Sequence, residues 1–410
     1  MTSKERVLAA VNHQQSDRVP IDFGGHRSSG IMAIAYAKLK KYLGIHSGDI
    51  YVYDFVQQLA IVEPDVLDVL EIDVTEMGRG YMHNANEWQD WTLPDGTPCK
   101  IPGYIHVEKR GDDWILFSEN GTEVGIQKKG CLYFEQTHFP MIERAIQDDD
   151  FSDLKEILKN LMWSTPHPGG HLPLDAEGLK QLATYAKALR ESSDRAIVGL
   201  FGGNLFEVPQ WLYRIDNYMM NMALYPEAVY RLSEMLTDIY LANLEKWLGA
   251  VGKYIDIVLF GDDLGGQKGP LISPVMYREF YKPFHKKMWQ RAKELADVKI
   301  NLHSCGAIEP FLDDLIDAGL DIINPVQIAC TGMDAESLKR KYGDRMCFWG
   351  GGCDTQHILP MGTTQAVADH VRKQVSTFKP GGGFVFQQVH NIMVNVPPEN
   401  IVTMFKSINS

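Results

Sequence analysis

Short apolar runs, each ended by Gly, Pro or a polar residue, recur along the chain and predict β-strands. Segments between them carry apolar residues at helical spacing. The clearest is 227–248, where Val229, Leu232, Leu236 and Tyr240 recur every three or four positions. Strands that alternate with helices are typical of parallel βα units. The predicted strands cover residues 19–23, 197–201, 255–260, 298–303, 321–324, 346–349 and 384–389, with a weaker eighth at 72–76.

About eight such units closed into a ring form a single (β/α)8 TIM barrel, the α/β fold that we predict for residues 1–410. An open doubly wound sheet is the competing architecture, because a count of strands does not separate the two. A further helix is expected to begin at Ser273-Pro274, an N-cap followed by a first-turn proline. Other helices are predicted at residues 310–318, 334–341, 363–377 and 398–407.

The segment 86–136 breaks this alternation. The turn dipeptides Asp95-Gly96 and Asn120-Gly121 separate short runs of alternating apolar and polar residues, a pattern typical of an antiparallel meander. A structureless loop of roughly 50 residues would be unusual inside a compact domain. We therefore predict a small antiparallel β insertion at residues 86–136, within one barrel domain.

The composition limits the classes of binding partner and the cellular compartment that we expect for the protein. The 53 Asp and Glu residues against 40 Lys and Arg give a formal net charge of −13, so binding to nucleic acid is not expected. Six cysteines are too few for a disulfide scaffold in 410 residues. The charged start of the chain precedes no apolar region, and no apolar run reaches the roughly 20 residues that span a bilayer. We predict a cytoplasmic protein with reduced thiols and no membrane association.

In a parallel βα barrel, reactive groups lie where strands end. His303 ends the predicted strand 298–303 and Cys305 follows two residues later. Side chains two residues apart on a strand share a face, so both can point into one cavity. Imidazole and thiolate suit Zn²⁺, which in catalytic sites commonly has three protein ligands. Cys353 or His390, each after another strand, could be the third ligand, and Cys330 is a weaker choice. The alternative is a buried histidine beside an inert cysteine.

Acidic residues follow a neighbouring strand. Asp262 and Asp263 lie in a Gly-rich turn after the strand 255–260, where a carboxylate can act as acid, base or ligand. Adjacent side chains rarely point the same way, so we expect at most one of the two to be functional. Turn formation or a helix N-cap is the alternative.

A basic pair follows the first predicted strand. His26 and Arg27 could bind an anionic group, helped by backbone N–H groups beyond Ser28. The alternative is an N-cap with one surface charge.

Several blocks resemble the uroporphyrinogen decarboxylase superfamily, and they run in order across nearly the whole chain. The resemblance implies a single (β/α)8 barrel. The blocks are Asp17-Arg-Val-Pro20, Asp262-Asp-Leu-Gly-Gly-Gln267, Leu302-His-Ser-Cys-Gly306, Asp317-Ala-Gly-Leu-Asp321, Gly351-Gly-Cys-Asp-Thr-Gln356 and Pro397-Pro-Glu-Asn400.

The superfamily has at least two chemistries. True uroporphyrinogen decarboxylases are cofactor-free and bind tetrapyrrole carboxylates with an Arg-Gln-Ala-Gly-Arg motif after the first strand. This chain has Gly25-His-Arg-Ser-Ser-Gly30 there, with one arginine. The other branch holds zinc-dependent methyltransferases that work with a corrinoid protein, and the pair His303 and Cys305 resembles theirs. Their third ligand is a cysteine after the last strand, where this chain has His390.

The resemblance to the second branch gives our leading hypothesis. It is a zinc-dependent methyltransferase that moves a methyl group between a small methylated substrate or thiol and a corrinoid (cobalamin) carrier on a separate protein. Asp262 or Asp263 would orient a ligand or move a proton, and Gln267 and Asp354 would contact substrate or support the ligands. The alternative is a decarboxylase of the uroporphyrinogen type, and a third hypothesis is a barrel that binds a ligand without turnover.

Overall fold

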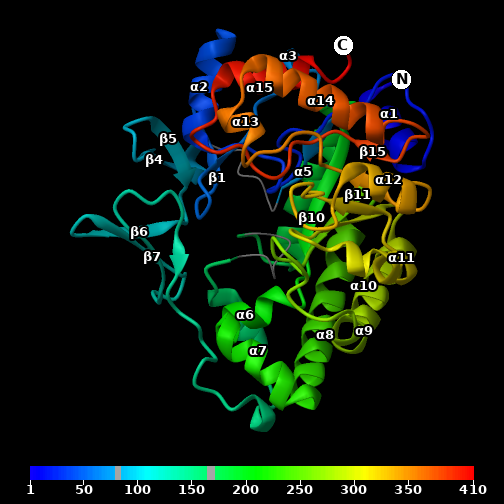
Figure 1. Ribbon diagram of the computed structural model, residues 1–410. Coiled ribbons are helices and arrows are strands. Elements are labelled where there is room, and N and C mark those ends of the chain that lie inside the picture. Colours follow the sequence, from blue (N-terminus) through cyan, green and yellow to red (C-terminus); the bar gives the residue numbers. More distant parts are fainter. Residues whose placement is uncertain (79–84, 164–170) are drawn as a thin grey trace.

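The computed structural model describes residues 1–78, 85–163 and 171–410 (Figure 1). Seven parallel strands form one curved sheet in the order β15-β14-β13-β12-β11-β10-β3. Each strand is followed by helical segments that pack against the outside of the sheet. The strands are β3 (Val74–Glu76), β10 (Ala196–Gly202), β11 (Ile257–Gly261), β12 (Lys299–His303), β13 (Ile322–Asn324), β14 (Cys347–Trp349) and β15 (Phe384–Val385).

The segment around Ile21 occupies the eighth place and closes the ring. Ile21 forms a parallel bridge with Phe386, just beyond β15, and its carbonyl accepts a 2.8 Å hydrogen bond from the N–H of Asp73, just before β3. The predicted strand 19–23 is therefore a single bridge, yet it joins the two edges of the sheet. The predicted (β/α)8 barrel is confirmed, and the open doubly wound sheet is excluded.

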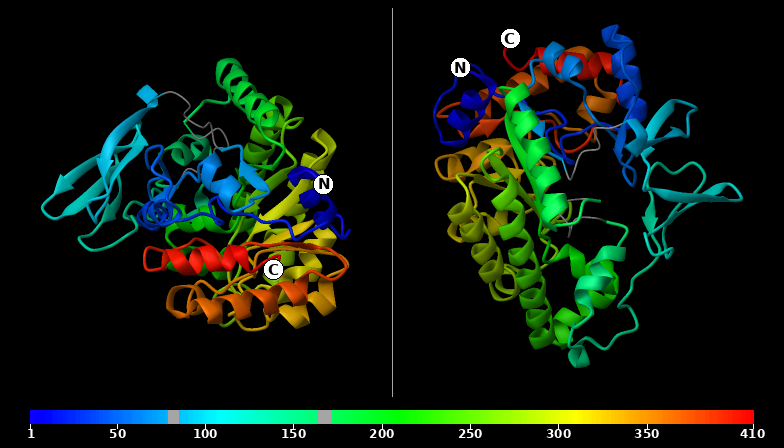
Figure 2. Two further views of the ribbon diagram at one scale, coloured as in Figure 1. Left: turned by 90° about the horizontal axis from the view of Figure 1, so that it is seen from above. Right: turned by 180° about the vertical axis from the view of Figure 1, so that it is seen from behind.

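The helices surround this barrel on its outer side (Figures 1 and 2). Helix α1 instead closes the amino-terminal end, where Val7, Ala10 and Val11 pack against interior residues such as Val198 and Ile257. The helices are α1 (Ser3–Val11), α2 (Ala33–Leu43), α3 (Pro64–Val69), α4 (Leu154–Ile157), α5 (Ala176–Ser192), α6 (Glu207–Tyr213), α7 (Ile215–Leu224), α8 (Pro226–Val251), α9 (Pro274–Phe280), α10 (Lys282–Leu295), α11 (Leu312–Ala318), α12 (Ala335–Tyr342), α13 (Ile358–Met361), α14 (Thr364–Phe378) and α15 (Pro398–Lys406).

Antiparallel strands lie between β3 and β10 and project to one side of the barrel (Figure 2). A two-stranded sheet pairs β4 with β5, and a four-stranded sheet has the order β6-β7-β8-β9. The Trp91 and Trp114 rings, 4.6 Å apart, pack the two sheets together, and Phe55 adds an edge contact to Trp91. The strands of these two sheets are β4 (Trp88–Thr92), β5 (Pro98–Pro102), β6 (His106–Arg110), β7 (Asp113–Phe117), β8 (Glu123–Gln127) and β9 (Glu135–Gln136). A separate antiparallel pair, β1 (Val52–Asp54) and β2 (Leu59–Ala60), precedes β3.

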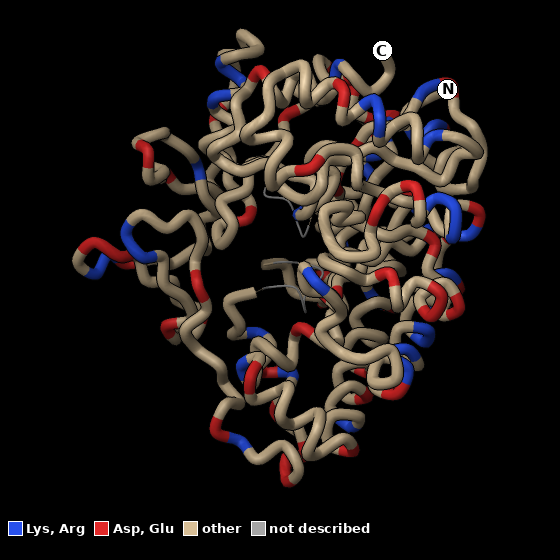
Figure 3. Tube along the Cα trace, viewed as in Figure 1, with Lys and Arg blue, Asp and Glu red and all other residues tan. Residues whose placement is uncertain are grey.

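Charged residues of both signs are interspersed along the described part of the trace (Figure 3). Among the residues that the structure describes, no helix combines the length and the apolar character that a membrane span requires.

Candidate metal centre

Three side chains that can bind a metal meet at the carboxyl end of the barrel. They are His303, at the end of β12, Cys305, two residues later, and His390, beyond β15. Their donor atoms all lie within 4.8 Å of one another, and each residue is half-buried. The Nε2 atom of His303 is 3.4 Å from the Sγ atom of Cys305, and the two imidazole rings are 5.4 Å apart. The three residues therefore form a compact nitrogen and sulfur donor group.

This donor group fits a zinc ion. Tetrahedral zinc with Zn–N bonds of about 2.0 Å and Zn–S bonds of about 2.3 Å separates a nitrogen ligand from a sulfur ligand by about 3.5 Å. The His303 to Cys305 distance of 3.4 Å matches that spacing. Three ligands leave one tetrahedral position for a substrate or water, as in catalytic zinc sites.

A hydrogen-bond chain fixes the orientation of His303. Its Nδ1 atom is 2.8 Å from Asn324 Oδ1, while Asn324 Nδ2 donates to the Trp349 carbonyl at 2.8 Å and to Gln387 Oε1 at 2.7 Å. Gln387 Nε2 in turn donates to the Ser28 carbonyl. A backbone carbonyl can only accept a hydrogen bond, so Asn324 and Gln387 must turn their NH₂ groups toward the Trp349 and Ser28 carbonyls. Asn324 therefore presents its oxygen to His303, and His303 Nδ1 carries the proton. The Nε2 lone pair is then free toward Cys305, the arrangement found in metal-binding histidines.

The loop that carries Cys305 is held by its backbone. Asp263 Oδ1 accepts a 2.8 Å hydrogen bond from the Cys305 N–H, and Gln327 Oε1 accepts one of 2.9 Å from the Gly306 N–H. Gly306 has φ +89°, and a Cβ atom there would lie 2.3 Å from the backbone of Gly265. Only glycine combines that conformation with that close approach, which explains why the His-Ser-Cys segment ends in Gly.

Burial shifts the pKa values of all three donors. It lowers the pKa of His303, and it lowers that of His390 to about 3, where the neighbouring His303 adds to the effect. Both imidazoles are therefore neutral at neutral pH, with lone pairs available. Burial, followed by the negative charge of Asp263, raises the pKa of the Cys305 thiol well above its usual range. The thiol then keeps its proton until a cation replaces it.

His390 is positioned by the seam between the first and last strands of the barrel. The segment that carries it hydrogen-bonds to the first loop, since Asn391 Oδ1 accepts from the Gly30 N–H at 2.9 Å and Gln387 donates to Ser28. His390 itself has φ +65°, a left-handed conformation that the surrounding bonds impose.

The two adjacent carboxylates of the sequence motif have different surroundings. Asp262 is fully buried and accepts hydrogen bonds of 2.9 to 3.1 Å from the N–H groups of residues 205, 206 and 207 at the start of α6. His285 Nε2 lies 3.2 Å from its Oδ2. Asp263 instead faces the donor group, 3.6 Å from His303 Nε2. Asp263 thus lies at the site and Asp262 behind it.

Glu207, which the sequence analysis did not single out, lies beside these carboxylates. Its Oε2 atom accepts from Asn204 Nδ2 at 2.6 Å and from the Asp263 N–H at 3.1 Å. Burial, with the charges of Asp263 and Asp262, raises the pKa of Glu207 well above its usual range. The segment Gly202-Gly-Asn-Leu-Phe-Glu207 directly follows β10, so the criterion applied to the other strand ends would have found it.

The two residues of the basic pair in the first loop, His26 and Arg27, also have different surroundings. His26 is fully buried, with Nε2 3.3 Å from Asp22 Oδ2. Arg27 is four-fifths buried and its Nε lies 3.3 Å from Asp54 Oδ2, the one ion pair of its guanidinium within the described residues. The Tyr53 hydroxyl nearby is buried without a hydrogen-bond partner in that part of the chain. His26 thus has a structural role in the loop, whereas Arg27 has guanidinium N–H groups that make no hydrogen bond within the described residues.

Four other candidates lie outside the donor group. Cys353 is fully buried, and its Sγ is 3.9 Å from the Asp354 carbonyl. Asp354 accepts from the Gln356 N–H at 2.7 Å, as in a turn. Gln267 is exposed, and its Oε1 lies 3.4 Å from the Cys330 thiol.

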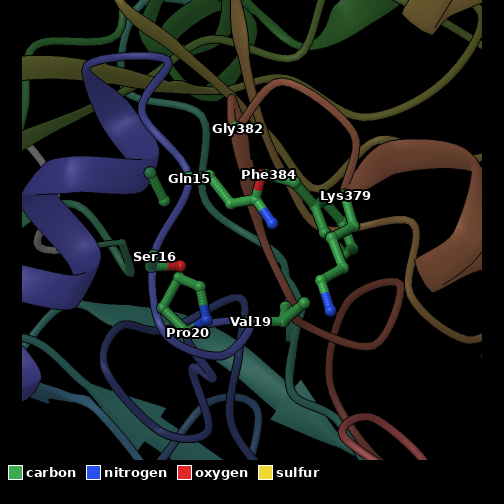
Figure 4. A pocket seen from close by; sticks show the side chains of 8 residues that line it. Gln15, Ser16, Val19, Pro20, Lys379, Gly382 and Phe384 are labelled. Carbon is green, nitrogen blue, oxygen red and sulfur yellow. The ribbon is translucent and has the colours of Figure 1, made fainter.

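A pocket at the opposite end of the barrel lies between α1 and the turn before β15 (Figure 4). Ser16, Lys379 and Phe384 are among its lining residues. Because these residues lie before the barrel strands or at the start of β15, the pocket and the donor group are at opposite ends of the barrel.

A closed parallel barrel with a His/Cys/His group at its carboxyl end defines the TIM-barrel class of enzymes with a candidate metal centre. The sequence profile described as uroporphyrinogen decarboxylase (URO-D) matches residues 169–410, which is more than half of the chain. The chain therefore belongs to the uroporphyrinogen decarboxylase family.

Individual proteins give similar results. A uroporphyrinogen decarboxylase from Psychromonas ingrahamii is 26% identical over 298 residues, which cover 70% of this chain and 76% of that protein. One from Legionella pneumophila is 24% identical over 156 residues, covering 38% of this chain and 41% of that protein. Among solved structures, a methyltransferase from Methanosarcina mazei superposes with a TM-score of 0.58 at 16% identity, covering 99% and 98% of the two chains. This likeness establishes the shared fold.

Proposed function

We propose that the protein is a zinc-dependent methyltransferase that moves a methyl group between a small substrate and a corrinoid carried by a partner protein. The observation that carries the proposal is the His303, Cys305 and His390 group, whose donors lie within 4.8 Å of one another. A zinc ion held there would act as a Lewis acid toward a thiol or toward the leaving atom of a methyl donor. The fold shared with the Methanosarcina mazei methyltransferase agrees with this proposal.

The residues of the chain prepare the site for that chemistry. Asn324 keeps the proton of His303 on Nδ1, so that Nε2 faces the metal position. Asp263 holds the Cys305 backbone, and its negative charge lies 3.6 Å from His303 Nε2. We assign these two residues to positioning the ligands, and His390, rather than Cys353, to the third ligand place.

Arg27 is proposed to bind an anionic part of the substrate or carrier. Its terminal amino groups make no hydrogen bond within the described residues, while its side chain is four-fifths buried. Its loop is hydrogen-bonded to the segment that carries His390, so Arg27 and the donor group belong to the same end of the barrel. His26 supports this loop through Asp22, and Gln267 and Asp354 have more distant, supporting places.

Decarboxylation of a tetrapyrrole remains the second candidate, because the named relatives at 24% and 26% identity are uroporphyrinogen decarboxylases. This reaction would depend on Arg27 and would leave Cys305 without a role. An assay for coproporphyrinogen formation by the purified protein separates the two functions.

Metal content tests the leading proposal. Purified protein should contain about one zinc per chain by mass spectrometry, and Cys305→Ser and His390→Ala should each reduce it at least tenfold. Cys353→Ser is the matched control and should keep the zinc. Cobalt(II) in place of zinc adds a second readout, since a thiolate ligand produces a charge-transfer band that Cys305→Ser should abolish. Protein that binds neither metal, even when metal is supplied, would refute the proposal.

A further inference from the structure

Glu207 is a carboxyl group held at the mouth of the barrel with one oxygen uncommitted. Its Oε2 atom accepts from Asn204 Nδ2 and from the Asp263 N–H. Its Oε1 atom makes no hydrogen bond within the described residues, and the side chain is half-buried rather than sealed from solvent. One oxygen is thus fixed by donors, and the other is available to a bound molecule.

The position of Glu207 is set by buried groups behind it. Asp262 accepts the N–H groups of residues 205, 206 and 207, and His285 supports Asp262 while its Nδ1 atom lies 3.1 Å from the Tyr277 hydroxyl. Asp262 therefore fixes the first turn of α6, on which Glu207 is the first residue. Such a rigid support is typical of a group that acts in catalysis.

Glu207 also stands next to the donor group without touching its members. Its Oε2 bonds to the backbone of Asp263, whose side chain bonds to the backbone of Cys305. The negative charges of Asp263 and Asp262, together with burial, favour the protonated form of Glu207. A neutral carboxyl group bonded to the backbone of Asp263, which itself faces the donor group, is equipped to give a proton to a bound molecule rather than to accept one.

We propose that Glu207 is the proton donor to the leaving oxygen of the methyl donor, and that the substrate is therefore a methyl ether. This inference rests on the proposed methyltransferase function. The O–CH₃ bond breaks, and the reduced corrinoid carrier supplies the electron pair of the new bond to the methyl group. The electron pair of the broken bond stays on oxygen, which takes the proton from Glu207. The products are an alcohol or phenol and the methylated carrier, and solvent returns a proton to Glu207.

The chemistry of the leaving group distinguishes this substrate class from the others. An alkoxide or phenoxide is a strong base, so its departure is helped by a proton. A quaternary ammonium ion leaves as a neutral amine and needs none. A buried acid beside the site therefore favours ethers over methylated ammonium compounds.

Methyl transfer from two aryl methyl ethers tests the proposal. Zinc-loaded full-length protein is supplied with cob(I)alamin and either 4-methylanisole, a poor leaving group, or 4-nitroanisole, a good one. Glu207→Gln should lower the rate with 4-methylanisole by about 10²- to 10⁴-fold, the usual range for a general acid, and the rate with 4-nitroanisole far less. Glu207→Asp should recover part of the loss. Glu309→Gln, which alters a carboxylate paired with Lys341, is the matched control and should react like wild type. An equal loss with both ethers would overturn the role of Glu207.

Binding of 4-nitrophenol gives a readout that needs no turnover and no corrinoid. The absorption of this probe reports whether it is bound as phenol or phenolate. Wild-type protein should bind it mainly as the phenol, and Glu207→Gln should shift it toward the phenolate. Identical spectra, or the absence of binding, would overturn the inference. Zinc binding without methyl transfer from any donor would instead contradict the proposed function, while the probe would still test the proton donor.

Discussion

Replacing Asn324 by leucine tests how the barrel orients the candidate metal centre. Leucine has the same branched outline and the same number of side-chain heavy atoms as asparagine, but it cannot accept from His303 Nδ1 or donate to the Trp349 carbonyl and Gln387 Oε1. Partners of this kind typically contribute 10- to 100-fold to metal affinity. We expect zinc affinity to fall by that factor, about 1.4 to 2.7 kcal/mol.

The same substitution should also reduce stability. The Trp349 carbonyl and Gln387 Oε1 would remain buried without their donor, at a cost of about 1 to 3 kcal/mol each, so the total is about 2 to 6 kcal/mol. Zinc affinity is measured by competition with a chelator, and the free energy of unfolding by denaturant titration of the metal-free protein.

Asn301 supplies a matched control on the same strand. It lies two residues before His303 on the same face of β12, and neither atom of its buried amide has a partner within the described residues. Asn301→Leu should leave zinc affinity unchanged and stability equal or higher, because it removes an unpaired polar group. If the two leucine variants lose zinc equally, or if Asn324→Leu keeps wild-type affinity, the role assigned to Asn324 is refuted.

Three further changes have defined outcomes. Gly306→Ala should lower the free energy of unfolding by at least about 2 kcal/mol and abolish zinc binding, because its Cβ would lie 2.3 Å from the Gly265 backbone. Calorimetry measures both effects, and a variant that binds zinc normally would contradict the close approach. Asp262→Asn should destabilise the start of α6 by about 2 to 4 kcal/mol in urea, because the amide would place a donor against backbone donors; an unchanged midpoint would refute this role. Arg6 holds the pKa of Asp17 below its usual range, so this pair stabilises the fold above about pH 4 and the effect is lost as the pH falls further. Asp17→Asn should therefore lower the free energy of unfolding by about 0.5 kcal/mol at pH 7, since the pair is partly exposed, and by progressively less as the pH falls below about 4; an equal loss at pH 7 and pH 2 would contradict the sign.

The sequence predicted those features that depend on local periodicity. The alternation of strands and helices predicted parallel βα units, and the family resemblance favoured the closed barrel over an open sheet. The two-residue spacing predicted that His303 and Cys305 lie together, because a strand alternates its faces. The first strand shows the limit of that approach, since only Ile21 forms a bridge where a strand was expected. Curvature at the seam of a closed sheet depends on partners far away in the chain, which a local pattern does not contain.

The choice between Cys353 and His390 could not be made from the sequence for a related reason. Both follow strands, and the difference lies in the path of each loop. Cys353 is turned toward the Asp354 carbonyl, whereas the bonds of the seam impose a left-handed conformation on His390. Glu207 lies five residues beyond the end of β10, where the strand-end criterion would have found it, but its orientation depends on Asp262 from another unit, which a local pattern does not contain.

The seam between the first loop and the last strand has a consequence for the order of events during synthesis. His303 and Cys305 leave the ribosome together, but His390 follows only after another 84 residues have been added. It is held in place by Ser28 and Gly30, which were made long before it. A complete donor group thus exists only once the oldest and youngest parts of the barrel have met. If the group holds zinc as proposed, metal loading would be a late step of maturation, and zinc retention would report a finished barrel.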